Sequence, residues 1–193
     1  MISTKKKEGN ALQLRRARPG KHEHFLNRAR VVAERSTCLR RKVGAIIVSK
    51  DGVELSSGYS GAPRGLKHCI DIGECLRTEL RIPSGQRYEL CRSVHAEQNA
   101  IINAARTGAS IVGGEMYISS EKMKGGYSTG GEKDKIYGPC IICKKMIINA
   151  GLTAVHMREE GVGERSYTTE QIEKLLVREE KAWRKKYRRD GHI

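Results

Sequence analysis

Residues 91–100, CRSVHAEQNA, open an apolar helix with a histidine and an acid only two residues apart. The helical pattern continues to about residue 106 and ends before Gly108, which suits a left-handed cap. His95 and Glu97 both lie in the first turn, where they point to different sides of the helix. This helix start therefore carries two chemically active side chains that packing alone does not require.

Outward from this helix, the hydrophobic pattern predicts alternating helices and strands. Asp51-Gly52 between two apolar runs predicts an antiparallel hairpin. Thr168 and Gln171 form a capping-box pattern before the last helix. That helix is expected to turn Ile172, Leu175, Leu176 and Trp183 inward. The predicted helices are 21–36, 94–106, 140–150 and 169–189, and the predicted strands are 43–48, 53–59, 115–119 and 152–158. This alternation predicts an α/β fold with a sheet covered by helices.

Length and composition restrict the class of protein. The 193 residues suffice for one domain, which we expect over residues 21–160, between a basic N-terminal tail (1–20) and a basic C-terminal helix and tail (161–193). No apolar run is long enough to span a membrane, and MISTKKKEGN lacks the apolar segment of a secretory signal. We therefore expect a cytoplasmic protein without a membrane partner. The six cysteines are then metal ligands or redox groups rather than disulfides.

The net charge of +15 raises the question of nucleic-acid binding. Much of the excess lies at the two ends, in residues 5–18 and in the final WRKKYRRDGHI. A charged tail is more often a solvated or oligomer-contacting segment than a specific reader of nucleic acid. We therefore expect a small anionic substrate with a phosphate rather than nucleic acid as the partner.

Pro139-Cys140-Ile141-Ile142-Cys143 places two thiols one turn apart at another predicted helix start, where the helix dipole favours thiolates. With His95 they make three ligands suited to a catalytic zinc ion, which keeps its fourth position for water. Glu97 could then move the proton of that water without ligating the metal. His-x-Glu followed by Pro-Cys-x-x-Cys is the signature of zinc-dependent deaminases. The predicted zinc ligands are His95, Cys140 and Cys143, and the predicted catalytic residue is Glu97.

Four segments, STCLRRKVGAIIVSKDG, GYSGAPRGLKHC, ELCRSVHAEQNAII and PCIICKKMIINAG, resemble the deoxycytidylate (dCMP) deaminase family over residues 36–157. The resemblance implies a cytidine deaminase-like three-layer α-β-α sandwich with a mixed five-stranded sheet. It also implies hydrolysis of dCMP to dUMP with release of ammonia, which feeds thymidylate synthesis. Further implications are a homo-oligomer, often a hexamer, and control by dCTP and dTTP, with Mg²⁺ accompanying a nucleotide effector.

One position departs from the family pattern. Gly58-Tyr59-Ser60-Gly61 stands where family members usually show Gly-Tyr-Asn-Gly. Because that asparagine belongs to the nucleoside-binding part of the pocket, Ser60 leaves the base and sugar open, and a modified cytosine nucleotide is an alternative substrate. By resemblance the expected pocket walls are Val43, Ala45, Ser60 and Ala96, although Val43 and Ala45 are equally explained as strand core. The phosphate candidates, chosen because cationic side chains match phosphate oxygens, are Arg40, Arg41, Lys42 and Arg64.

The four remaining cysteines are Cys38, Cys69, Cys75 and Cys91. Four thiols are the number that a closed structural zinc site requires, and some dCMP deaminases carry a second, structural zinc with cysteines matching Cys38 and Cys69. The alternatives are buried free thiols, or a disulfide in an oxidising compartment.

Two long segments, 61–90 and 121–138, exceed plain turns, and loops of this length are usually functional. The second leads into Pro139-Cys140 and is expected to form a flap or subunit contact beside the pocket. The alternative is a plain surface loop.

Two other classes of function stay open. A nucleic-acid deaminase of the tRNA adenosine type shares the zinc motif and would explain the basic ends, although the insertion between Gly58 and Cys91 is more typical of nucleotide deaminases. The second class is a non-catalytic, zinc-stabilised binding module, in which Glu97 would be dispensable.

Overall fold

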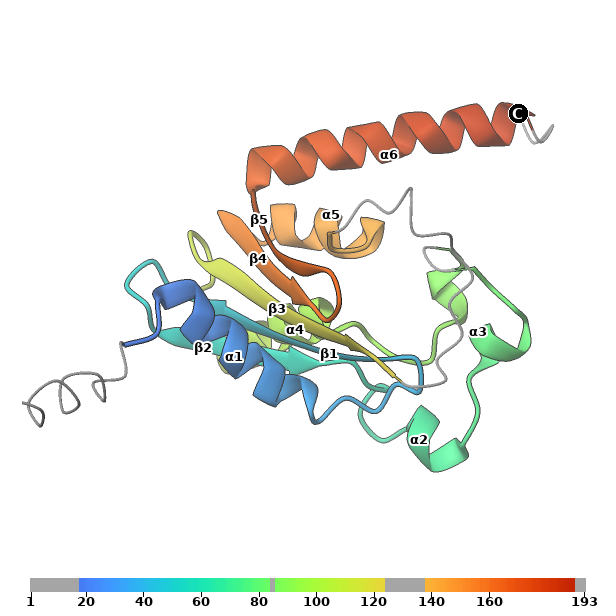
Figure 1. The fold of residues 1–193 in the computed structure, drawn as a ribbon, viewed down its shortest axis with the longest axis horizontal. Helices are drawn as coiled ribbons and strands as arrows, with labels where there is room; N and C mark the ends of the chain where they lie inside the picture. Colours follow the sequence, from blue (N-terminus) through green and yellow to red (C-terminus); the bar gives the residue numbers. More distant parts are fainter. Residues whose placement is uncertain (1–17, 84–85, 124–137, 190–193) are drawn as a thin grey trace, which may run out of the picture.

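The computed structural model describes residues 18–83, 86–123 and 138–189, and its centre is a five-stranded sheet (Figure 1). The strand order is β2-β1-β3-β4-β5. β3 and β4 are parallel, whereas the other neighbouring pairs are antiparallel. The strands are β1 (Arg41–Val48), β2 (Glu54–Tyr59), β3 (Glu115–Lys122), β4 (Ala154–Glu159) and β5 (Gly163–Thr168). The sheet is therefore mixed, as predicted.

Helices cover both faces of this sheet, which confirms the predicted three-layer α-β-α sandwich (Figure 1). The helices are α1 (Lys21–Ala33), α2 (Cys69–Ile72), α3 (Leu76–Glu79), the 3-10 helix η1 (Tyr88–Leu90), α4 (Ala96–Thr107), α5 (Ile141–Asn149) and α6 (Thr169–Arg189). Successive side chains of β1 point to opposite faces. Ala45 and Ile47 join the core under α4 and α5, whereas Ile46 and Val48 join the core under α1.

Two glycines allow a helix to approach the sheet closely on each face. A Cβ atom on Gly44 in β1 would lie 2.3 Å from the backbone nitrogen of Ala33 in α1. A Cβ atom on Gly58 in β2 would lie 2.3 Å from the backbone nitrogen of Ala100 in α4. Any larger side chain would push the helix away, so these glycines set the depth at which α1 and α4 dock.

The predicted elements occur in the predicted order, with different ends. The hairpin at Asp51-Gly52 is confirmed, because β1 and β2 pair antiparallel on either side of it. The first helix ends at Ala33 rather than at residue 36. Strand β5 was not among the strands located from the sequence, and the segment 61–90 contains α2, α3 and η1.

The last helix, α6, begins with the predicted capping box. The backbone nitrogen of Thr168 donates to Gln171 Oε1 at 2.9 Å, and the nitrogen of Gln171 donates to Thr168 Oγ1 at 3.4 Å. Ile172 is buried as predicted, whereas Leu175, Leu176 and Trp183 are only half-buried. The ammonium group of buried Lys144 in α5 pairs with Glu179, which ties α6 to α5.

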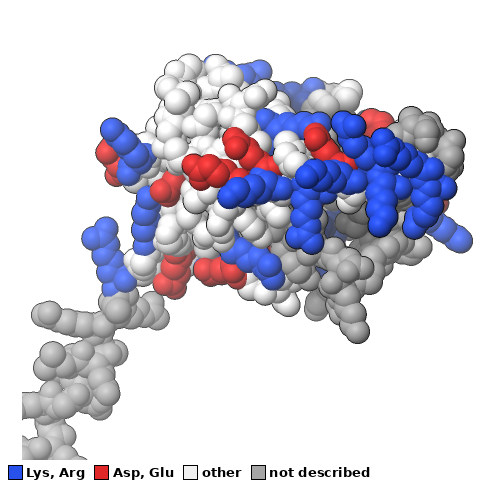
Figure 2. Space-filling view, turned by 90° about the horizontal axis from the view of Figure 1, so that it is seen from above, with Lys and Arg blue, Asp and Glu red and all other residues white. Residues whose placement is uncertain are grey.

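The outer face of α6 is basic, and Figure 2 shows Lys and Arg side chains along it. Its exposed basic residues are Lys174, Arg178, Lys181, Arg184, Lys185, Arg188 and Arg189. Among the described residues, no helix is long and apolar enough to cross a bilayer. Most of the N-terminal tail and most of the predicted flap, residues 124–137, lie outside the described residues.

The close approach at Gly44 can be tested by Gly44→Ala. The added Cβ would meet backbone atoms of α1 at 2.3–2.4 Å, so overpacking should lower the free energy of unfolding by about 1–3 kcal/mol. Denaturant-induced unfolding measures the loss. The matched control is Gly138→Ala, whose Cβ would meet nothing closer than Lys144 Cε at 3.8 Å. Equal stability of the two variants would contradict this account of helix docking.

Candidate functional site

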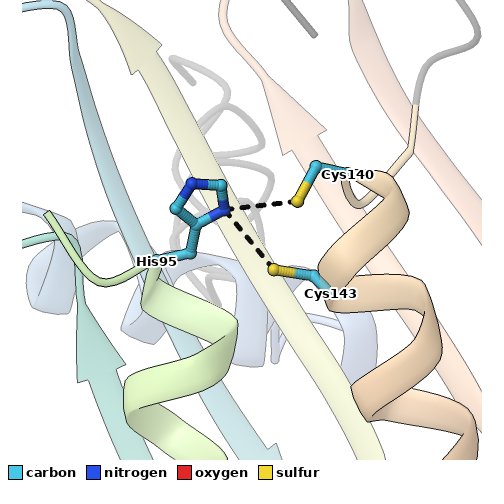
Figure 3. Close-up of side chains that lie close together, drawn as sticks. All are labelled: His95, Cys140 and Cys143. Carbon is cyan, nitrogen blue, oxygen red and sulfur yellow. Dashed lines mark hydrogen bonds between the residues drawn. The ribbon is translucent and has the colours of Figure 1, made fainter. Parts of the chain in front are cut away.

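The starts of α4 and α5 bring three metal-ligating side chains together (Figure 3). The sulfur of Cys140 lies 3.3 Å from His95 Nδ1, and the sulfur of Cys143 lies 3.5 Å from the same nitrogen. In the described ranges of the chain, this is the only group of three or more His, Cys, Asp or Glu residues whose ligand atoms all lie within 4.8 Å of one another. The structure thus gathers the three residues that the sequence predicted.

Backbone and side-chain contacts fix the α4 side of this group. His95 is the N-cap residue of α4, and its backbone nitrogen donates to Gln98 Oε1 at 2.9 Å. Just before it, Val94 and Gly61 form an isolated antiparallel bridge, with Val94 N donating to Gly61 O at 2.8 Å. The amide of Asn99 donates to the carbonyl of Tyr59 at 2.8 Å. The ligand from α4 is therefore tied to the end of β2.

The two thiols and the imidazole share protons. A hydrogen bond with Cys143 lowers the pKa of Cys140, and His95 adds to this effect against the opposing effect of burial. The same hydrogen bond and burial raise the pKa of Cys143. Burial lowers the pKa of His95, but the hydrogen bond to Cys140 and the charge of Glu97 outweigh it, so the pKa is raised. Cys140 is thus held as a thiolate beside a proton that a cation can replace.

Glu97 lies in the first turn of α4 and is buried. Burial raises the pKa of its carboxyl group, although His95 acts in the opposite direction. A carboxyl group with a raised pKa can both accept and donate a proton near neutral pH. Glu97 therefore has the protonation chemistry expected of a general acid and base beside the three ligands.

The donor set fits a zinc ion. Two thiolates and one imidazole nitrogen are ligands that zinc prefers, and three protein ligands are typical of a catalytic site with one open position. Nδ1 of His95 faces both sulfurs, so one ion can contact all three atoms. Because α5 starts at these thiols, its dipole also favours their deprotonated forms.

The expected pocket walls fall into two groups. Ala45 and Ala96 are fully buried in the same hydrophobic cluster as Cys143, so they support the ligand from below as core residues. Ser60 is buried, and its backbone is fixed because its nitrogen donates to Val43 O at 3.0 Å and its carbonyl accepts from Thr37 N at 2.9 Å. The strand end at Val43 is therefore joined to the segment that carries Ser60.

The structure gives two of the four phosphate candidates a partner in another element. Arg41 forms an ion pair with Glu159 at the end of β4. Arg64 donates to Asn103 Oδ1 in α4 at 3.0 Å. Arg40 and Lys42 are half-buried at the start of β1.

The four other cysteines lie near one another without forming a second group of ligand atoms within 4.8 Å in the described residues. All four are free thiols. Burial raises the pKa of Cys69, and the charges of Cys38, Cys75 and Cys91 add to the increase. The backbone nitrogen of Arg40 donates to the sulfur of Cys38 at 3.4 Å. Cys69 is therefore close enough to the other three thiols for their charges to affect its pKa.

Sequence reasoning missed two side chains of the 61–90 segment that reach the metal ligands. The ring of Tyr88 lies 5.1 Å from the ring of His95, and the guanidinium carbon of Arg77 lies 5.0 Å from the centre of the Tyr88 ring. Arg77 lies in a helix of four residues and Tyr88 in one of three residues, which are too short to give a periodic pattern in the sequence.

The chain is similar to known proteins over the region that contains this site. The profile described as "Cytidine and deoxycytidylate deaminase zinc-binding region" matches residues 19–159. The chain is 32% identical over 139 residues to ComE operon protein 2 of Bacillus subtilis, over 72% of this chain and 59% of that protein. It is 32% identical over 143 residues to the deoxycytidylate deaminase of Mycobacterium phage D29, over 72% of this chain and 94% of that protein.

A solved structure is also similar. It is the dCMP deaminase from the cyanophage S-TIM5 in complex with dCMP and dUMP, with a TM-score of 0.52, 27% sequence identity and coverage of 84% of this chain and 93% of that chain. The chain therefore spans nearly all of the two phage proteins, but only 59% of the Bacillus relative.

Removal of one ligand should remove one metal ion. We expect Cys143→Ser to bind one zinc ion fewer per chain than the wild-type protein, because two ligands hold the ion far more weakly than three. Inductively coupled plasma mass spectrometry of the purified proteins measures the difference. His24→Ala, which changes an exposed histidine of α1, is the control and should keep the wild-type zinc content. An unchanged content in folded Cys143→Ser would contradict the assignment of the ligands.

Proposed function

The chain belongs to the cytidine and deoxycytidylate deaminase family, and from this premise we propose that it hydrolyses dCMP to dUMP and ammonia. The observation that carries the proposal is the meeting of His95 Nδ1 with the sulfurs of Cys140 and Cys143 beside the buried carboxyl group of Glu97. The names of the relatives support the substrate, since the phage D29 protein is called a deoxycytidylate deaminase and the S-TIM5 enzyme is in complex with dCMP and dUMP.

In this mechanism, His95, Cys140 and Cys143 would hold a zinc ion. When bound, zinc would act as a Lewis acid that makes a water molecule nucleophilic toward carbon 4 of the cytosine ring. Glu97 accepts the proton of that water, delivers it to ring nitrogen 3 and later passes a proton to the leaving amine. Carbon 4 thereby gains an oxygen and loses its amino group as ammonia. The raised pKa of Glu97 suits both directions of proton transfer.

Ser60 is proposed to border the nucleoside, because its backbone is fixed beside Val43 and precedes the bridge that positions His95. Its hydroxyl group is shorter than the amide of the usual asparagine, so a modified cytosine nucleotide remains the alternative substrate. For the phosphate, the candidates proposed on their charge are Arg40, Arg41, Lys42 and Arg64.

We further propose a second, structural zinc held by Cys38, Cys69, Cys75 and Cys91. The electrostatic influence of the other three thiols on Cys69 supports their proximity, and a backbone N–H donating to the Cys38 sulfur is a contact that stabilises a thiolate. A metal ion here would supply free energy of folding to a segment whose helices α2 and α3 have only four residues each.

Other features of the family are proposed from the resemblance alone. They are a homo-oligomer, a hexamer in particular, activation by dCTP and inhibition by dTTP, with Mg²⁺ bound to the effector. A cytoplasmic location is proposed because all six cysteines are free thiols, which suits a reducing compartment.

A second candidate function, deamination of a nucleic acid, is favoured by one observation. The exposed basic face of α6 could contact phosphates (Figure 2). The two functions separate when ammonia release from free dCMP is compared with deamination of a tRNA anticodon stem-loop. Release from dCMP alone supports the proposed function.

The catalytic role of Glu97 is tested by Glu97→Gln. The amide keeps the shape of the side chain but cannot carry the proton, so dCMP turnover should fall by about 10²- to 10⁴-fold while zinc content stays at the wild-type value. A coupled ammonia assay and metal analysis measure both quantities. Glu89→Gln, which changes an exposed carboxylate of η1, is the control and should turn over dCMP normally. Normal dCMP turnover by zinc-loaded Glu97→Gln would contradict the proposed role of Glu97 in the mechanism.

The second zinc is tested by Cys69→Ser. We expect the content to fall from two zinc ions per chain to one, with a lower melting temperature, because the buried thiol would be a ligand of the structural ion. Metal analysis and thermal unfolding measure both effects. One zinc ion per chain in fully loaded wild-type protein would refute the second site and leave the catalytic site unaffected.

A further inference from the structure

The ring of Tyr88 lies against the ring of the metal ligand His95. The ring centres are 5.1 Å apart and the planes meet at 76°, which is an edge-to-face arrangement. Aromatic pairs favour this geometry because the positive edge of one ring meets the negative face of the other. A rotation of the imidazole about its bond to Cβ would disrupt this edge-to-face arrangement. The contact therefore resists rotation of the ring that carries Nδ1.

The direction of His95 Nδ1 depends on the plane of the imidazole ring. Its Nδ1 faces the two sulfurs, so Nε2 is the atom at which a ligating histidine is usually held by a hydrogen bond to a second group. Packing against a neighbouring ring also holds the plane of an imidazole, and Tyr88 is the aromatic side chain in contact.

Arg77 in turn fixes Tyr88. Its guanidinium carbon lies 5.0 Å from the centre of the Tyr88 ring, within the range of a cation–π interaction. Nη2 of Arg77 donates to the carbonyls of Pro83 at 3.3 Å and Gln86 at 2.7 Å. Arg77 is only 7% exposed. The two hydrogen bonds to carbonyls restrain the buried guanidinium group, and this group in turn restrains the Tyr88 ring that it covers.

The surroundings of Tyr88 place it at the metal centre rather than in a separate core. Its ring contacts both the imidazole of His95 and the guanidinium group of Arg77. It does not belong to either hydrophobic cluster of the sheet.

We propose that Tyr88, backed by Arg77, is a positioning residue that sets the ring plane of His95 and so directs Nδ1 at the zinc ion. The inference rests on the zinc site of the proposed function, but it needs no assumption about the substrate. It extends the metal centre from α4 and α5 into the 61–90 segment, because Arg77 lies in α3 and Tyr88 in η1.

The test uses two substitutions of Tyr88 in the full-length protein. Tyr88→Leu removes the ring, and we expect the affinity for zinc to fall by about 10- to 100-fold, the usual effect of losing a residue that orients a ligand. The cobalt-substituted protein should also show an altered visible absorption spectrum, because the ligand geometry changes. Tyr88→Phe keeps the ring and should match the wild-type protein in both readouts. The affinity is measured for the zinc centre that Cys143→Ser abolishes. A second, structural zinc ion therefore does not affect the comparison of the two Tyr88 variants.

The control is Tyr187→Leu, which removes an exposed tyrosine on α6 and should leave affinity and spectrum unchanged. Wild-type affinity and spectrum in folded Tyr88→Leu would overturn the proposal, and so would a Tyr88→Phe variant that behaves like Tyr88→Leu, because the hydroxyl group would then be responsible.

If Tyr88→Leu does not fold, nuclear magnetic resonance of the zinc-loaded wild-type protein decides the question. We expect a nuclear Overhauser effect between the Tyr88 and His95 ring protons, and its absence overturns the contact. If the wild-type protein does not turn over dCMP, the proposed function is refuted. The zinc affinity, the absorption spectrum and the nuclear Overhauser effect would still test the role of Tyr88.

Discussion

The approach of two helix starts to one point is the constraint on which the rest of the structure depends. A thiolate, a second thiol, an imidazole and a carboxyl group converge at the first turns of α4 and α5, and most of them are removed from water. Charged groups tolerate such burial only when they are paired or bind a cation. The hydrogen bond between the two sulfurs lowers the pKa of Cys140 and raises the pKa of Cys143. The arrangement of these groups therefore favours a bound cation over a proton shared between the sulfurs.

The sheet is built to hold the two helix starts at this separation. α4 docks at the depth that Gly58 allows, and its side chains Asn99 and Asn103 donate to the carbonyls of Tyr59 and Ser57 in β2. α5 connects to the parallel neighbour of β3, so both helices begin beyond the same end of the sheet. This agrees with the general tendency of α/β proteins to place their sites at the carboxyl ends of parallel strands. Buried Lys144, which follows the ligand Cys143, is paired with Glu179, so α6 also restrains the ligand helix.

The sequence predicted the parts of the molecule that follow a period or a short motif. The hairpin, the helices of the core and the set His95, Cys140 and Cys143 with Glu97 nearby were all found in this way, and the five-stranded sheet came from the family resemblance. Strand β5 was missed because GERSYT is exposed at nearly every position and so has no alternation of apolar residues. The phosphate candidates were chosen by charge, but Arg41 is engaged by Glu159, a partner that is distant in sequence. Patterns report local periodicity, whereas partners of this kind depend on tertiary structure.

The 61–90 segment shows the same limit and explains why a long insertion can be part of the site. Its cysteines, Cys69 and Cys75, begin or precede the short helices α2 and α3, and Arg77 follows two residues later. Helices of four residues are not stable by themselves, so the position of Arg77 depends on what holds these turns. Arg77 covers Tyr88, and Tyr88 contacts His95. A chain of contacts therefore runs from α3 through Arg77 and Tyr88 to a ligand of the catalytic centre, so part of the long insertion belongs to the site.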